Sequence, residues 1–293
     1  MPVKAAILPC STPRTYNPAM EDRWDAGFCA RAPLFAPLAP YARLMRGDVW
    51  PPLTQLQSLL EQSGIVSGGG QPLRLMPQPA RGGSFEERYE VRLYLRGELC
   101  MRTANWHDFF NLMVWLAFPR AKAALNTRHY QAALAQRESR ALNRGPAQDA
   151  LTLFDEGGVI VTSSEPALLE DLRRFAWKRL FLERRDEVGV CMDWQVFGHA
   201  LYEKALSPYV GVTGRGLLML VEPAFHMLSI AEQTVQLDER VARYLAVPEH
   251  LRVTRDLTPV PVLGVPGWWP ANEDPAFYDN TSYFRSPASS RPR

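Results

Sequence analysis

The stretch from residue 105 to residue 129, NWHDFFNLMVWLAFPRAKAALNTRH, is among the most apolar of the chain, yet it carries polar side chains at helical intervals. Its apolar run, 109–118, stops at Pro119, far short of the roughly 20 residues that cross a membrane. The pattern therefore predicts a core helix over about 106–118. Because proline suits the first turn of a helix, we expect a second helix over about 119–142.

The first turn of this core helix holds groups suited either to chemistry or to helix initiation. Asn105 can cap the helix, with Asp108 at the third helical position, and capping is the simplest role for this pair. His107 lies where the helix dipole disfavours an imidazolium, so it can accept a proton or bind a metal ion. Asn111 follows one turn later on the same face. The alternative for His107 is a hydrogen-bonded core histidine.

The second predicted helix carries a polar face of its own. Lys122, Asn126 and His129 follow one another in steps of four and three residues. If the two helices fold back on each other at the proline, His107 and Asn111 meet Asn126 and His129 in a common hollow. The alternative is that this face is exposed to solvent, as most polar helix faces are.

Further candidate residues lie later in the chain. His199 precedes Glu203 by four residues on one helical face, a spacing that can hold a metal ion or orient an imidazole but more often gives a simple hydrogen bond. Asp149, directly before a predicted strand, can point back toward the helices. Asp155 and Glu156 resemble a paired-carboxylate site, but their place at a predicted hairpin tip favours a role in the turn.

The segment 259–285 is rich in aromatic residues, proline and glycine, so it cannot form a long helix. It either wraps the body of the protein or lines a cleft with aromatic side chains such as Trp268. We favour wrapping and keep Trp268 as a candidate ligand-binding residue.

Alternation of apolar and polar residues predicts two β-hairpins, over 89–103 and 149–163, the second around the sequence DEGG. A strand is expected at 216–222. Helical periodicity predicts further helices at 53–64, 164–185, 193–206 and 229–247. Hairpins beside helices favour an α+β fold, with β-hairpins packed against a helical core, over a doubly wound parallel sheet.

Proline separates a regular middle of the chain from two irregular arms. Twelve of the 25 prolines lie in residues 1–80 and seven in 251–293, and proline disfavours the interiors of helices and strands. We predict a Pro-rich N-terminal arm (1–85) packed on the body, a mixed α+β core (86–255) and an aromatic, Pro-rich wrapping tail (256–293). The apolar side chains of the N-terminal arm cannot stay in water, so we expect a single domain overall.

The two ends carry little information on targeting. The start, MPVKAAILPCSTPR, lacks the unbroken apolar run of a secretory signal, and the closing SPASSRPR is expected to fray. The four cysteines show no zinc or redox spacing; they stand at positions 10, 29, 100 and 191. We therefore expect reduced thiols in a cytoplasmic protein with no membrane insertion.

Charge argues against nucleic-acid binding as the main role. The 33 Lys and Arg residues nearly balance the 31 Asp and Glu residues, unlike the composition of a tail-driven nucleic-acid binder. The segment 173–185 combines basic residues with Trp177 and Phe181, which can contact phosphates and bases. Interleaved carboxylates favour a solvated face with internal salt bridges instead, so this binding mode is the weakest alternative.

No catalytic signature is present. The chain lacks H-E-x-x-H and G-x-S-x-G, a phosphate-binding loop and a dinucleotide fingerprint. The sequence GVTGRG (211–216) is short and precedes a strand rather than a helix. Motifs therefore assign no reaction.

Four blocks together resemble the bacterial domain-of-unknown-function family 3025 and occur in that family's order over roughly 30–287. They are NWHDFFNLMVWLAFPRAKAALNTRH (105–129), RGPAQDALTLFDEGGVIV (144–161), FGHALYEKAL (197–206) and GWWPANEDPAFYDNTSYFR (267–285). The resemblance implies a bacterial, mostly proteobacterial, origin. It brings no established activity, cofactor or site residue.

Two hypotheses of function follow. The first is an enzyme or small-ligand-binding protein with a buried His/Asp/Asn pocket, in which His107 acts as general base or metal ligand in hydrolase-like chemistry, with a single divalent ion as an option. Its candidate catalytic residues are His107, Asp108, Asn111 and His199, and its candidate ligand-binding residues are Asn126, His129, Asp149, Glu203 and Trp268. The second is a non-enzymatic interaction protein that contacts partners through its arms. The substrate, the metal and the oligomeric state are left open.

Overall fold

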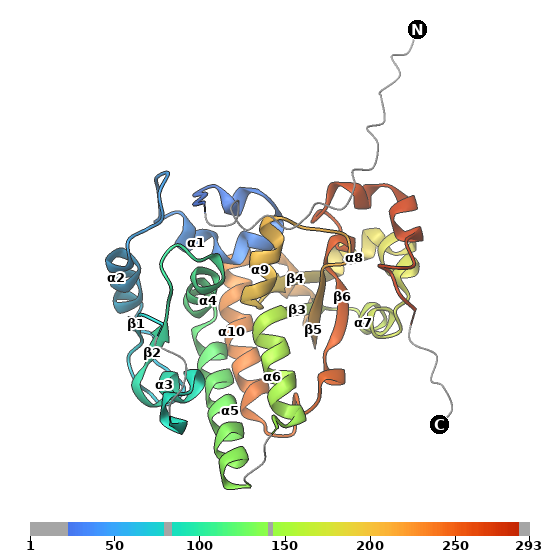
Figure 1. Cartoon of the computed structure of the whole chain (residues 1–293). Coiled ribbons are helices and arrows are strands. Elements are labelled where there is room, and N and C mark those ends of the chain that lie inside the picture. Colours follow the sequence, from blue (N-terminus) through green and yellow to red (C-terminus); the bar gives the residue numbers. More distant parts are fainter. Residues whose placement is uncertain (1–22, 79–83, 140–142, 287–293) are drawn as a thin grey trace.

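The computed structural model describes residues 23–78, 84–139 and 143–286. The predictions that the start of the chain lacks a secretory signal and that its last residues, 287–293, fray lie outside these described residues. Within these ranges the chain has the predicted α+β class (Figure 1). A mixed four-stranded sheet and a two-stranded parallel sheet lie among the helices. No helix in the described parts combines the length and the apolar character that crossing a membrane requires.

The two helices predicted from the opening stretch form its core. They are α4 (Trp106–Ala117), which is buried on nearly all sides, and α5 (Pro119–Glu138). Pro119 occupies the first turn of α5 as expected, and the end predicted near residue 142 falls among residues that are not described. Helix α10 (Ile230–Ala246) runs beside α5 (Figure 1), and its Asp238 accepts hydrogen bonds from the first backbone amides of α5.

The larger sheet has the order β4-β3-β5-β6. Its strands are β3 (Gly158–Ser163), β4 (Met192–Val196), β5 (Thr213–Leu220) and β6 (Thr258–Pro261). Strand β3 is antiparallel to β4 and parallel to β5, and β5 is antiparallel to β6. Every residue of β3 is buried, as expected for a strand inside a sheet that is covered on both faces. The smaller sheet pairs β1 (Arg74–Met76) with β2 (Glu98–Cys100).

The first predicted hairpin is wrong. Residues 89–96 form helix α3, and Gly97, with φ of 66°, ends that helix rather than forming a hairpin turn. The alternation of apolar and polar residues gave the wrong prediction because the polar Arg92 is itself buried. Its guanidinium binds the buried carboxylate of Glu98 at 2.6 Å. A polar side chain paired in the interior does not mark a solvent-facing position.

The second predicted hairpin is also wrong. Residues 146–157 form helix α6, which passes directly into β3. The second glycine of the sequence DEGG allows this direct passage from helix to strand. A Cβ on Gly158 would clash, because it would lie 2.4 Å from the carbonyl oxygen of Phe154. Asp155 and Glu156 therefore lie on the last turn of a helix instead of at a hairpin tip.

Two predicted helices are interrupted. The segment 164–185 divides into α7 (Pro166–Arg173) and a π-helical turn (Arg179–Glu183), separated by Phe175 with φ of 58°. Residues 193–196 belong to β4, and only His199–Leu206 form helix, α9. The helices predicted at 53–64 and 229–247 and the strand predicted at 216–222 are confirmed.

The remaining elements are short. The other α-helices are α1 (Ala39–Ala42), α2 (Leu53–Ser63) and α8 (Arg185–Cys191). Single 3-10 turns are Phe28–Ala30, Pro33–Leu38, Phe85–Glu87, Pro223–Met227, Thr254–Asp256, Val262–Gly264, Pro270–Glu273 and Pro275–Asp279.

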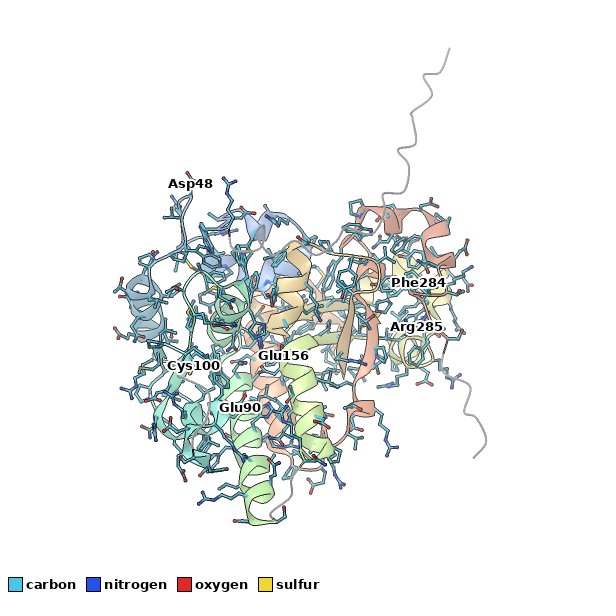
Figure 2. All side chains as sticks on the ribbon, viewed as in Figure 1. Asp48, Glu90, Cys100, Glu156, Phe284 and Arg285 are labelled. Atoms are coloured by element: carbon cyan, nitrogen blue, oxygen red, sulfur yellow. The ribbon has the colours of Figure 1, made fainter. Side chains whose placement is uncertain are left out.

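Aromatic side chains connect both ends of the described chain to its middle. The ring of Trp24 stacks on Trp106 with centroids 5.1 Å apart. Near the other end, Trp177 donates from its indole nitrogen to the carbonyl oxygen of Arg285, which Figure 2 places at one edge of the molecule. These contacts bury the apolar side chains of the ends. The division into an arm, a core and a tail stays a prediction.

Candidate functional site

Two histidines from distant parts of the sequence meet at the end of α4. The Nε2 atom of His107 lies 3.2 Å from the Nε2 atom of His199, with the rings at 75° to each other. His107 belongs to the first turn of α4 and His199 is the first residue of α9. Gly198 lets α9 begin here, because a Cβ at that position would lie 2.4 Å from the backbone nitrogen of Gly158.

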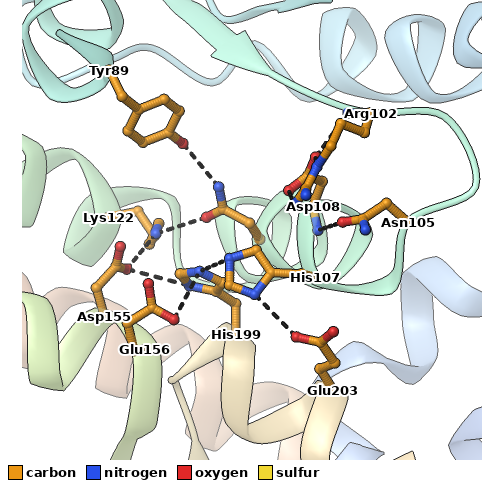
Figure 3. A network of polar contacts seen from close by, with 11 residues as sticks. Tyr89, Arg102, Asn105, His107, Asp108, Lys122, Asp155, Glu156, His199 and Glu203 are labelled. Carbon is orange, nitrogen blue, oxygen red and sulfur yellow. Dashed lines mark hydrogen bonds and ion pairs between the residues drawn. The ribbon is translucent and has the colours of Figure 1, made fainter. Parts of the chain in front are cut away.

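Three carboxylates surround the imidazole pair (Figure 3). Glu203, one turn along α9, places Oε2 3.1 Å from Nδ1 of His107. From the last turn of α6, Glu156 places Oε2 3.6 Å from Nε2 of His199, and Asp155 places Oδ1 3.8 Å from Nδ1 of the same ring. Nδ1 of His107 thus has a carboxylate at hydrogen-bond distance, whereas the buried Nδ1 of His199 has no hydrogen-bond partner among the described residues and lies 3.8 Å from Asp155.

The site lies at the boundary between core and solvent. The side chain of His199 is 5% exposed, whereas those of His107 and Glu156 are 30% and 43% exposed. Burial lowers the pKa of His199 to about 3, against the attraction of Asp155, so this ring is neutral at pH 7. The hydrogen bond to Glu203 raises the pKa of His107. While His107 carries its second proton, its Nε2 can donate to the neutral His199.

A buried lysine extends the site. The ammonium group of Lys122, on α5, lies 2.5 Å from Oδ1 of Asp155 and 3.0 Å from Oδ1 of Asn111. Burial alone would raise the pKa of Asp155, but Lys122, together with His199 and His129, outweighs it and holds that pKa at about 2. The amide of Asn111 in turn donates to the hydroxyl of Tyr89 at 2.9 Å. Asp155 is therefore a carboxylate anion at neutral pH that lies beside both His199 and Lys122.

The polar face of α5 points into the protein rather than into solvent. Lys122, Asn126 and His129 are all buried. Asn126 donates to the side chain of Glu90 at 3.2 Å, and His129 lies beside Glu90 and Asp155. His129 and Asn126 thus gather around Glu90 instead of joining His107, and the two groups are linked through Asp155.

Three candidates lie outside this network. The carboxylate of Asp108 turns toward Arg102 (Figure 3), accepting from its backbone amide and its guanidinium, each at 2.8 Å. The amide of Asp108 is capped by Asn105 as predicted. Asp149 is exposed on the first turn of α6, and Trp268 is buried in the hydrophobic core. No contact described for the imidazole pair involves Asp149 or Trp268.

The sequence patterns did not identify several residues of the network as site residues. Asp155 and Glu156 were assigned to a turn, although Pro146 as a first-turn proline and the apolar residues at 150, 151 and 154 fit a helix. No pattern in the sequence pointed to Tyr89 and Glu90 as site residues. They lie well before α4, in a segment whose apolar and polar residues alternate like those of a strand. Only the tertiary fold brings them to α5.

The basic segment 173–185 is balanced by carboxylates. Each basic side chain has an acidic partner within 4.0 Å; the pairs are Arg173–Glu170, Arg174–Glu170, Lys178–Asp279, Arg179–Asp171, Arg184–Asp171, Arg184–Glu187 and Arg185–Glu273. Trp177 and Phe181 are buried. These contacts support the expectation that nucleic-acid binding is not favoured here, which stays a prediction.

Comparison with known proteins identifies the family of this chain but no characterised relative. No curated protein and no solved structure matches this chain. A family model described as a protein of unknown function (DUF3025) matches residues 73–288, a range that includes every residue of the polar network. More than half of the chain is covered, and the resemblance carried by the four sequence blocks is confirmed. The chain belongs to the DUF3025 family, whose function is unknown.

Proposed function

We propose that this protein binds one divalent transition-metal ion through His107, His199 and Glu156, and that it is an enzyme of the metal-assisted hydrolase class. The observation that carries the proposal is that His107, His199 and Glu156 each offer one ligand atom within 4.8 Å of the other two, with the Nε2 atoms of the two histidines 3.2 Å apart. Two imidazoles and one carboxylate are a ligand set of catalytic zinc sites.

The distances suit a shared ion. With metal–nitrogen bonds of about 2.0–2.1 Å, two ligands in a tetrahedral arrangement lie about 3.3–3.4 Å apart. The observed separations are 3.2 Å between the Nε2 atoms and 3.6 Å from His199 to Glu156. Only small side-chain movements would therefore be needed to bind an ion.

The surroundings support the same assignment. Ligating histidines ordinarily give their second ring nitrogen to a carboxylate, which orients the ring. Glu203 occupies that position for His107, and Asp155 lies near it for His199. The carboxylates of Asp155, Glu156 and Glu203 exceed the one nearby ammonium of Lys122, so the site attracts a cation.

Three protein ligands leave a coordination position for water or substrate. A zinc ion lowers the pKa of such a water to about 7, which yields a hydroxide nucleophile at neutral pH. Because the side chains of His107 and Glu156 are partly exposed, a substrate can approach the ion from solvent. The class of reaction we infer is hydrolysis of an ester, amide or phosphoester.

The first test measures metal binding alone. Protein treated with chelator is titrated with Zn²⁺ and Co²⁺, and metal content is measured after gel filtration. We expect Glu156→Gln and His199→Asn to lose the ion. The matched control is His226→Asn, because His226 also pairs with a carboxylate, Asp193 at 2.6 Å, but lies outside the site. Equal metal content in Glu156→Gln and in the unmodified protein would overturn the assignment.

The second test concerns hydrolysis. Chromogenic esters, anilides and phosphodiesters are offered to the protein before and after chelation. We expect an activity that chelation removes, Zn²⁺ restores and Glu156→Gln lacks. An activity that survives chelation but disappears in His199→Asn would instead assign the imidazole pair to acid–base catalysis without a metal.

A further inference from the structure

A small polar hollow around His129 lies beside the proposed metal site. His129 is 2% exposed, and neither of its ring nitrogens has a hydrogen-bond partner among the described residues. Both nitrogens are therefore removed from water without a compensating hydrogen bond, which destabilises the folded protein. Such an orphaned imidazole needs a ligand that the protein itself does not supply.

The hollow is small. Its cavity volume is about 10 Å³, and its lining includes Tyr89, Glu90, Lys122, Asn126, His129 and Asp155. A space of that size admits a single water molecule or ion.

The donor atoms around the hollow are those of a cation site. A ring nitrogen of His129 and carboxylate oxygens of Glu90 and Asp155 all lie within 4.8 Å of one another. Asn126 fixes Glu90 through its side-chain amide, and Lys122 fixes Asp155. The donors are therefore held in place from the helices α3, α5 and α6.

Charge favours a cation over a water molecule. The charged groups facing the hollow are the carboxylates of Glu90 and Asp155 and the ammonium of Lys122, with the hydroxyl of Tyr89 as a neutral neighbour. Two negative charges thus face one positive charge in a place where water screens them poorly. Figure 2 shows Glu90 and Glu156 in the central part of the molecule, near α5 and α6.

We propose that Glu90, His129 and Asp155 form a second binding site for a divalent transition-metal ion. Imidazole nitrogen with two carboxylates suits Zn²⁺, Mn²⁺ or Fe²⁺. Since Asp155 and Glu156 are consecutive, the last turn of α6 supplies one carboxylate to each site. Binding of an ion at the second site does not require the first site, although both ions would lie beside the proposed hydrolytic centre.

The test counts ions per chain in the full-length protein, using Zn²⁺ and Co²⁺ as probes. We expect two equivalents in the unmodified protein and one in each of Glu90→Gln, His129→Asn and Glu156→Gln. The control is Glu86→Gln, which changes a carboxylate of the preceding turn that is 43% exposed and pairs with Arg137; it should bind two. Glu90→Gln keeps the size of the side chain. It therefore still tests the second site if the variant at the buried His129, His129→Asn, does not fold.

The outcomes separate the two sites. One equivalent that Glu90→Gln loses and Glu156→Gln retains supports the second site and removes the first. One equivalent that Glu156→Gln loses and Glu90→Gln retains overturns the second site and leaves the first, and the hollow then holds water. An unmodified protein that binds no ion overturns both.

Discussion

The Nε2 atoms of His107 and His199 lie 3.2 Å apart although 92 residues separate the two histidines in the chain. Each ring is placed by the start of a helix, α4 in one case and α9 in the other. The first turns of α4 and α9 must therefore stay close together for the two imidazoles to meet.

Glu203→Gln should weaken metal binding without removing the site. The carboxylate of Glu203 accepts from Nδ1 of His107 and does not belong to the proposed ligand set. Loss of such an outer partner typically costs about 10–100-fold in metal affinity. Competition against a metal-sensitive dye measures the affinity, and we expect the number of ions per chain to stay unchanged. Exposed Glu222→Gln is the control; equal affinity in both variants would show that Glu203 does not support His107.

Asn105→Ala should destabilise the start of α4. The side chain of Asn105 accepts from the backbone amide of Asp108 at 3.1 Å, and removal of such a cap costs about 1 kcal/mol in the free energy of unfolding. Urea denaturation measures the change. Asn105→Ser keeps an acceptor and should recover most of the loss; a serine variant as unstable as the alanine variant would contradict capping as the cause.

Asp238→Ala should destabilise the junction between α10 and α5. The buried carboxylate of Asp238 accepts from the amides of Arg120 at 3.2 Å and Ala121 at 2.8 Å. Without an acceptor these amides lose their partner, at a cost of about 1–3 kcal/mol in unfolding free energy. Burial raises the pKa of Asp238, so the charged form carries a desolvation cost and Asp238→Asn should lose less.

The neighbouring Glu239 provides the control for this position. Its side chain is 51% exposed and pairs with the exposed Arg120 and Arg243. Exposed ion pairs contribute little, so Glu239→Ala should change the unfolding free energy by less than about 0.5 kcal/mol. Equal losses in Asp238→Ala and Glu239→Ala would rule out the amide contacts as the source of stability.

The buried pair of Glu98 and Arg92 should make stability depend on pH. Burial alone would raise the pKa of Glu98, but hydrogen bonds and charge from Arg92 and Arg74 outweigh it and lower that pKa below its ordinary value of 4.5. Because the folded pKa is depressed, the stabilisation is present above pH 4.5. It is lost as the pH falls through the folded pKa.

Comparison with Glu98→Gln isolates this contribution. At pH 7 we expect the variant to be less stable by about 3 kcal/mol, since a buried guanidinium loses its charged partner. The difference should shrink as the pH falls from 4.5 through the lowered pKa of folded Glu98, because Glu98 takes up a proton first in the unfolded chain and then in the folded protein. Urea unfolding at several pH values measures it, and a difference that does not change with pH would exclude the ion pair as its source.

Much of the fold was predictable from local patterns. The helices α4, α5 and α10 and the cap at Asn105 depend on hydrophobic periodicity and on hydrogen bonds between residues three or four apart, so the chain needs no distant partner to encode them. Pattern reasoning failed at α3 and α6. A short segment that alternates can fit a helix or a strand when a polar residue such as Arg92 is paired in the interior.

The candidate site was predictable only in part. The sequence by itself determined that His107, Asn111, Lys122 and His129 lie on polar faces of two successive helices, because spacing along a helix follows from its 3.6-residue period. Only the tertiary structure decided which groups meet. The approach of His199 to His107, and of Glu90 to His129, depends on how α9 and α3 pack against α4 and α5, and that packing is a balance of buried contacts over the whole core that no local pattern records.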